Sequence, residues 1–166
     1  MIIFIDTNIL ISAALNPNST PFHAYVKANT LPNRAVISEQ VIAEMHRIFE
    51  KKFPMKLPAL EIFIKQLREH MTIIGNELSY DAKEELIRDR NDRPLLRAAI
   101  KANADIILTG DKDFLEAELD KPLPMTATDF LLLGTYEKSA TSFFINEPIH
   151  PYGIMFPYNS FQDIFS

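Results

Sequence analysis

Short apolar runs rich in β-branched residues alternate with helical segments along most of this chain. The runs Ile2–Ile5, Arg34–Ser38 and 105–109 predict buried strands, and 72–75 predicts a further short strand. Segments with helical periodicity or helix-start residues separate or follow them: Thr7–Leu15, 21–28, 38–52, 58–71, 80–87, 93–102 and 128–133. Strands joined through helices need crossover connections, so the sequence predicts a three-layer α/β/α fold with a mostly parallel central sheet.

The length of the chain, 166 residues, suits one well-packed domain. We expect this domain to cover residues 1–134. Residues 135–166 are rich in aromatic residues and prolines, so we expect an extension packed on the domain or on a partner. The absence of cysteine excludes disulfides and thiolate metal sites. No apolar run reaches roughly 20 residues and no basic leader opens the chain, so we expect a soluble, cytoplasmic protein without membrane contact.

The formal net charge of -5 bears on the class of ligand. A module that binds nucleic acid through electrostatics alone is usually basic, so this charge counts against that class. It counts less against a metal-dependent enzyme, because a bound cation matches clustered acids and basic residues can lie beside them.

Acidic residues follow two of the predicted strands. Asp6 comes directly after Ile2–Ile5, and Asp111 comes just after 105–109. Ligands of parallel sheets bind beyond the carboxyl ends of the strands, so both acids occupy the position of a site. Each also has a purely structural explanation, since Asp6 suits a helix N-cap and Asp111 suits a polar turn.

Two further acids belong to the same predicted edge of the sheet. Glu44 flanks the apolar stripe of helix 38–52, and Asp92 precedes the Arg93-Pro94 helix start. Taken singly, each is better explained as a solvated helix glutamate or an N-cap. Taken together, four neighbouring carboxylates would repel one another and raise one another's pKa values. A hard divalent cation, which prefers oxygen ligands, removes that repulsion.

Three stretches in order along the chain resemble PIN-domain nucleases, of the kind found as toxins in VapC-type toxin–antitoxin pairs. They are FIDTNIL, SEQVIAEM and RDRNDRPLLRAAIKANADIILTGDKDFL, and the likeness covers residues 1–133. The resemblance implies a PIN-like fold in which the following residues form the catalytic metal site: Asp6, Glu44, Asp92 and Asp111. It also implies Asp113 as an auxiliary acid and Asn8 and Thr109 as polar supports.

The implied chemistry is hydrolysis of RNA phosphodiester bonds with Mg²⁺ or Mn²⁺. The ion would lower the pKa of a bound water and neutralise developing charge. Basic residues near the acids in sequence would hold substrate phosphates: Arg93, Arg97 and Lys112, with Arg90 and Lys101 nearby. The resemblance also implies a small antitoxin protein lying in a groove near the acids, and assembly as a homodimer.

Two other functions fit part of the pattern. A magnesium-dependent phosphatase or phosphoryl-acceptor domain also has an acid after its first strand, but Asp6-Thr7-Asn8 lacks a second acid two residues on. A non-catalytic PIN-fold module that binds RNA or protein would keep the fold without the chemistry. The presence of all four acids weighs against that second alternative.

Overall fold

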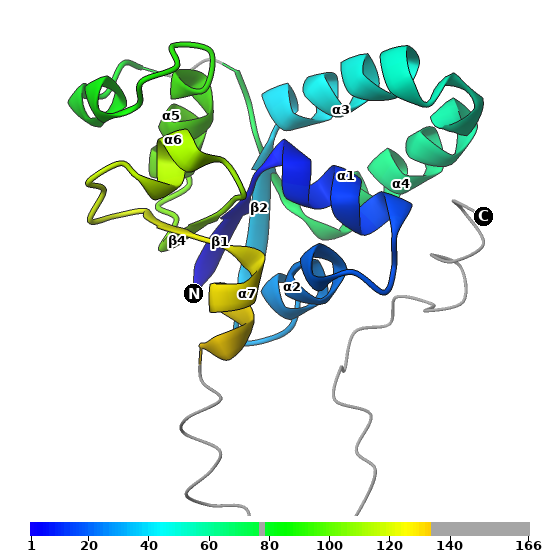
Figure 1. Ribbon diagram of the computed structural model, residues 1–166, viewed down its shortest axis with the longest axis horizontal. Coiled ribbons are helices and arrows are strands. Elements are labelled where there is room, and N and C mark those ends of the chain that lie inside the picture. The colour runs from blue at the N-terminus through cyan, green and yellow to red at the C-terminus, as the bar shows by residue number, and fades with distance from the viewer. Residues whose placement is uncertain (77–78, 134–166) are drawn as a thin grey trace, which may run out of the picture.

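A five-stranded, all-parallel sheet forms the centre of the computed structural model, which describes residues 1–76 and 79–133 (Figure 1). The strands lie in the order β3-β2-β1-β4-β5. Their bounds are β1 (Ile2–Ile5), β2 (Arg34–Ser38), β3 (Thr72–Ile74), β4 (Ile106–Leu108) and β5 (Leu123–Met125).

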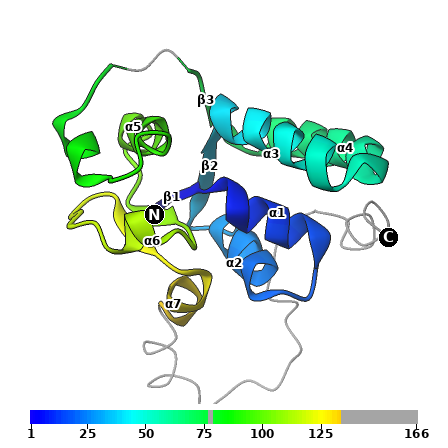
Figure 2. The same ribbon diagram turned by 45° about the horizontal axis from the view of Figure 1, so that its top comes forward.

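Helices cover both faces of this sheet, which confirms the three-layer α/β/α prediction (Figures 1 and 2). One layer contains α1 (Thr7–Leu15), α2 (Thr20–Ala28), α3 (Glu39–Lys52) and α4 (Leu57–His70), and the other contains α5 (Arg93–Lys101) and α6 (Lys112–Leu115). The strand order reverses after β3, and right-handed crossovers then place the following helices on the opposite face. Two 3₁₀ helices, η1 (Pro54–Lys56) and η2 (Ala82–Leu86), and a last helix, α7 (Ala127–Leu132), complete the described part.

Three of the observed elements were not predicted, and one has a different type. The strand β5, the four-residue helix α6 and the 3₁₀ helix η1 have no counterpart among the elements predicted from the sequence. The short strand β5 contains Pro124, a residue that argues against a strand when only the sequence is read. Segment 80–87 was predicted as an ordinary helix, but the structure has a short 3₁₀ helix there, η2.

The central strand β1 is buried on both sides, as expected for a parallel sheet between two helical layers. Ile3, Phe4 and Ile5 are fully buried, and Phe4 lies opposite Val36 of β2 and Ile107 of β4. The apolar stripe of α3 packs toward this core. The N-terminus of α3 is capped by Ser38, whose hydroxyl accepts a hydrogen bond from the Val41 N–H at 3.4 Å.

The side chain of Lys27 on α2 binds the C-terminus of α7. Its Nζ donates hydrogen bonds to the carbonyl oxygens of Phe130, Leu131 and Leu133 at 2.6, 3.1 and 2.7 Å. It also lies 4.9 Å from the centroid of the Phe130 ring. A lysine at a helix C-terminus satisfies carbonyls that have no partner within the helix and complements the negative end of the helix dipole.

A buried ion pair joins η2 to α5. The Glu84 side chain is 1% exposed, and its two oxygens accept hydrogen bonds from Arg97 Nε and Nη2 at 2.5 and 2.6 Å. Glu84 also accepts the Asp81 N–H at 2.9 Å in a capping box. The Arg97 hydrogen bonds hold the pKa of Glu84 below its usual value.

Two expectations concern parts outside this description. The aromatic extension expected at 135–166 and the domain end expected at 134 both lie outside the described residues. Within the described part, no helix combines the length and the apolar character needed to cross a membrane.

We predict that Glu84→Gln lowers the free energy of unfolding by about 2 kcal/mol, because it removes a charge-assisted pair and leaves Arg97 partly desolvated. The control is Glu85→Gln, since Glu85 pairs with Arg93 but is 59% exposed and its pair contributes about 1 kcal/mol or less. Urea unfolding measures both variants. Equal midpoints for the two would contradict the structural role given to Glu84.

Candidate metal centre

The carboxyl ends of β1 and β4 meet where the strand order of the sheet reverses. Ligands of open α/β sheets bind in the crevice at such a switch point. Asp6 directly follows β1, and Asp111 lies three residues after the end of β4. The structure therefore brings these two predicted residues to the same edge.

Asp6 is a buried carboxyl group, only 7% exposed. Its Oδ2 accepts a hydrogen bond from the Thr109 hydroxyl at 2.6 Å. It occupies the N-cap position of α1, but its side chain makes no capping hydrogen bond. Burial raises its pKa to about 6 against the lowering effect of Thr109, and the charges of Glu44 and Asp111 raise it further.

Asp111 is positioned by the loop that follows β4. Its N–H donates to the Thr109 hydroxyl at 3.0 Å, and its carboxylate caps α6 by accepting the Asp113 N–H at 2.8 Å. Asn8 accepts the Gly110 N–H at 3.4 Å, which links the start of α1 to the same loop. Asn8 and Thr109, the two predicted polar supports, thus both form hydrogen bonds with this loop.

Glu44 reaches this edge from α3. Its Oε2 accepts a hydrogen bond from the Thr7 hydroxyl at 2.9 Å, and its Oε1 lies 3.2 Å from Arg47 Nη2. Thr7 is 3% exposed and holds Glu44 toward the start of α1. No role was predicted for Thr7 from the sequence. The sequence feature that could have indicated a role for Thr7 is its position as a polar residue between two apolar runs.

Asp92 completes the group of four from the start of α5. It stands at the N-cap position without a side-chain capping bond, so the N-cap explanation does not account for its side chain. Loss of solvent contact raises its pKa to about 6, and the charges of Asp111, Asp89 and Glu44 add to this effect. The charges of Glu44 and Asp111 therefore raise the pKa values of both Asp6 and Asp92.

The donor set of these four carboxylates suits a hard divalent cation. Within residues 1–76 and 79–133, no Lys or Arg forms an ion pair with Asp6, Asp92 or Asp111. As the side chains stand, no three His, Asp or Glu residues of the described part are close enough to hold one ion together. Mg²⁺ usually keeps several waters and takes only one or two carboxylates directly, so the wider spacing does not conflict with it.

The predicted auxiliary acid and two of the predicted phosphate-binding residues already have partners. Asp113 pairs with Arg88, which lowers the Asp113 pKa. Arg93 donates to Glu85 at 3.0 Å and to the Ile87 carbonyl at 3.2 Å, and Arg97 pairs with the buried Glu84. Lys112 is exposed at the start of α6 and forms no ion pair with a described residue.

Comparison with known proteins now defines the family. The PIN domain family matches residues 2–113, more than half of the chain, so the chain belongs to this family. PIN domains are generally nucleases and generally use divalent metal ions. Among curated proteins, none matches the chain in sequence.

A solved structure shares the fold. It is the crystal structure of VapBC2 from Rickettsia felis bound to a DNA fragment from their promoter, with a TM-score of 0.55 and 20% sequence identity. The match covers 76% of this chain and 98% of that chain. At this identity the likeness shows a common fold, which agrees with the predicted PIN-like architecture.

The raised pKa of Asp6 predicts how stability depends on pH in metal-free buffer. In the unfolded chain the Asp6 carboxyl has its ordinary pKa of 3.8 and in the folded protein about 6, so between these values the folded state binds more protons. The free energy of unfolding should therefore rise as the pH falls from 7.5 to 5.5. Asp6→Asn should raise it at pH 7.5 by on the order of 2 kcal/mol and reduce the pH dependence, of which Asp92 supplies a further part.

Urea unfolding in EDTA at several pH values measures this effect. The control is Asp120→Asn, which changes an exposed acid in the loop between α6 and β5 and should leave the pH dependence intact. A metal-free Asp6→Asn variant that is less stable than wild type at pH 7.5 would contradict the assigned burial penalty.

Proposed function

We propose that this PIN-domain protein is a metal-dependent endoribonuclease that hydrolyses RNA phosphodiester bonds with Mg²⁺ or Mn²⁺. The observation that supports the proposal is that the charges of Glu44 and Asp111 raise the pKa values of both Asp6 and Asp92 beside the switch point of the sheet. Burying the Asp6 carboxylate costs free energy, so its position is better explained by a function than by a contribution to stability.

Each of the four acids has a role in this proposal. Asp6 and Asp111 would hold the ion, because they follow the two adjacent strand ends at the switch point. Glu44 and Asp92 would also hold the ion, act through water, or help to activate the nucleophile. The ion, when bound, supplies a water of lowered pKa and neutralises charge on the scissile phosphate. Thr7 and Thr109 hold Glu44 and Asp6 in orientation through their hydroxyl groups.

Positive charge for the RNA backbone comes from residues beside the acids. Of the three predicted phosphate-binding residues, Lys112 has the best supported role, because it is exposed and directly follows Asp111. Arg93 and Arg97 would have to share their guanidinium groups with the acidic partners they already have. Asp113, paired with Arg88, fits an auxiliary position next to the site.

We further propose that the chain is the toxin of a cytoplasmic toxin–antitoxin pair. The sequence resemblance to VapC-type toxins and the fold shared with VapBC2 support this assignment. The partner would be a small antitoxin protein that covers the groove near the acids. Assembly as a homodimer is part of the same proposal.

The first test is cleavage of labelled total RNA by the purified protein with Mn²⁺, with Mg²⁺ and with EDTA. We expect cleavage that needs the metal and falls by at least about a hundredfold in Asp6→Asn, because the variant loses a ligand charge. The matched control Asp120→Asn should cleave like the wild type. Cleavage that persists in Asp6→Asn would come from a contaminant or another site and would overturn the mechanism.

The toxin assignment has a separate test in growing bacteria. Induced expression of the wild-type chain should arrest growth, and Asp6→Asn should not, because arrest depends on RNA cleavage. Immunoblotting would confirm equal amounts of the two proteins. Normal growth with a wild-type protein that is fully active after purification would reject the toxin role and leave the ribonuclease proposal in place.

A further inference from the structure

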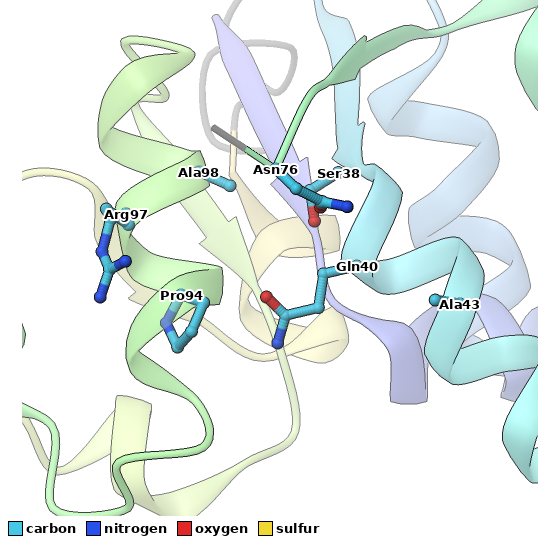
Figure 3. Close-up of a pocket in the computed structure, with 7 residues that line it drawn as sticks. All are labelled: Ser38, Gln40, Ala43, Asn76, Pro94, Arg97 and Ala98. Atoms are coloured by element: carbon cyan, nitrogen blue, oxygen red, sulfur yellow. The ribbon is translucent and has the colours of Figure 1, made fainter. Parts of the chain in front are cut away.

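A pocket of about 260 Å³ lies between α3 and α5 (Figure 3). Its walls come from the end of β2, the first half of α3, the backbone just past β3, and α5. The lining residues are Ser38, Gln40, Ala43, Asn76, Pro94, Arg97 and Ala98, all within the described part. Apart from the phosphate-binding role predicted for Arg97, none of these residues was assigned a function from the sequence.

The pocket adjoins the carboxylates on both of its helical walls. On α3, Gln40 lies four residues before Glu44, which corresponds to about 6 Å along a helix axis. On α5, Pro94 lies two residues after Asp92. A nucleotide next to a phosphate held by the acids is therefore within reach of this pocket.

The charge of the pocket does not suit a phosphate. Its one cationic lining residue, Arg97, directs its guanidinium group away from Gln40 in Figure 3 and pairs with Glu84. The positive charge of Arg97 is thus matched by a buried carboxylate. Because the neighbouring acids repel anions, the pocket favours a neutral polar group over a phosphate.

The polar groups of the pocket suit the edge of a nucleobase. Gln40 extends from α3 toward Pro94, and Asn76 lies beside it, past the end of β3 (Figure 3). Neither amide makes a hydrogen bond to a described residue. Each amide offers an acceptor oxygen and a donor NH₂ side by side, which is the arrangement that pairs with the polar edge of a base.

The remaining walls suit a planar ring. Pro94 presents apolar surface on α5, and Ala43 does so on α3. The volume is below the roughly 300–1,000 Å³ of pockets for drug-sized ligands, which fits a single base better than a longer ligand. Sequence-specific proteins commonly recognise single-stranded RNA by such bases turned out of the stack.

We propose that this pocket binds one nucleobase of the RNA strand next to the scissile phosphate, and that Gln40 and Asn76 recognise its hydrogen-bonding edge. The inference rests on the proposed ribonuclease function and adds a determinant of where the enzyme cuts. In this arrangement Arg97 is a positioning residue that holds α5 against η2 through Glu84.

A binding experiment without metal tests the pocket alone. The ¹⁵N-labelled full chain in EDTA is titrated with each of the four ribonucleosides and, separately, with inorganic phosphate. The side-chain NH₂ signals of Gln40 and Asn76 are assigned from Gln40→Ala and Asn76→Ala. We expect at least one nucleoside at millimolar concentration to shift both signals and phosphate to shift neither. Shifts with phosphate alone, or with none of the five probes, would overturn the proposal.

Mapping of cleavage sites with Mn²⁺ tests the pocket in the reaction. Gln40→Ala and Asn76→Ala should each lower the preference for the base beside the cut by about tenfold while still cleaving RNA. Asn18→Ala, which removes an exposed amide elsewhere, should keep the wild-type preference. An unchanged base preference in both pocket variants would overturn the proposed role of the pocket and leave the ribonuclease proposal in place. Absence of cleavage by the wild type would overturn the proposed ribonuclease function. The nucleoside titration would then decide whether the pocket binds a base.

Discussion

The hydroxyl group of Thr109 joins the carboxyl ends of β1 and β4, and the candidate site depends on it. It donates to Asp6 at 2.6 Å and accepts the Asp111 N–H at 3.0 Å, so one atom fixes an acid from each strand end. A buried carboxylate is costly without hydrogen bonds, and this bond makes the placement of Asp6 possible. The strand order reverses at this point, and Glu44 and Asp92 belong to helices on opposite faces of the sheet beside it.

Much of this architecture could be predicted because its signals are local. A short β-branched run followed at once by an acid identifies β1 and Asp6, and helical spacing places Glu44 beside the apolar stripe of α3. The strand β5 could not be found in this way, because it is three residues long and contains a proline. The partners of Thr7 and Arg97 were also hidden, since a hydrogen bond to a residue distant in sequence is decided by packing.

The distribution of positive charge sets Asp6 and Asp92 apart from most other acids of the described part. Arginines and lysines of the described part pair with acids such as Glu39, Glu84, Asp105 and Asp113, which all have lowered pKa values. Asp6 and Asp92 have no such partner among the described residues, and their pKa values are raised. These acids therefore fall into two groups, one with lowered and one with raised pKa values. A cation at the switch point would invert the sign of the local field that an approaching RNA strand meets.

The three carbonyl contacts of Lys27 fix the side of the sheet on which the described part of the chain ends. The helix α7 begins after the carboxyl end of β5 and runs back toward the opposite edge of the sheet, where α2 ends and β2 begins (Figure 1). Lys27 fixes that end of α7, so the backbone passes Leu133 at the edge remote from the carboxylates. The described part of the chain therefore ends, at Leu133, on the side of the sheet opposite the candidate metal centre.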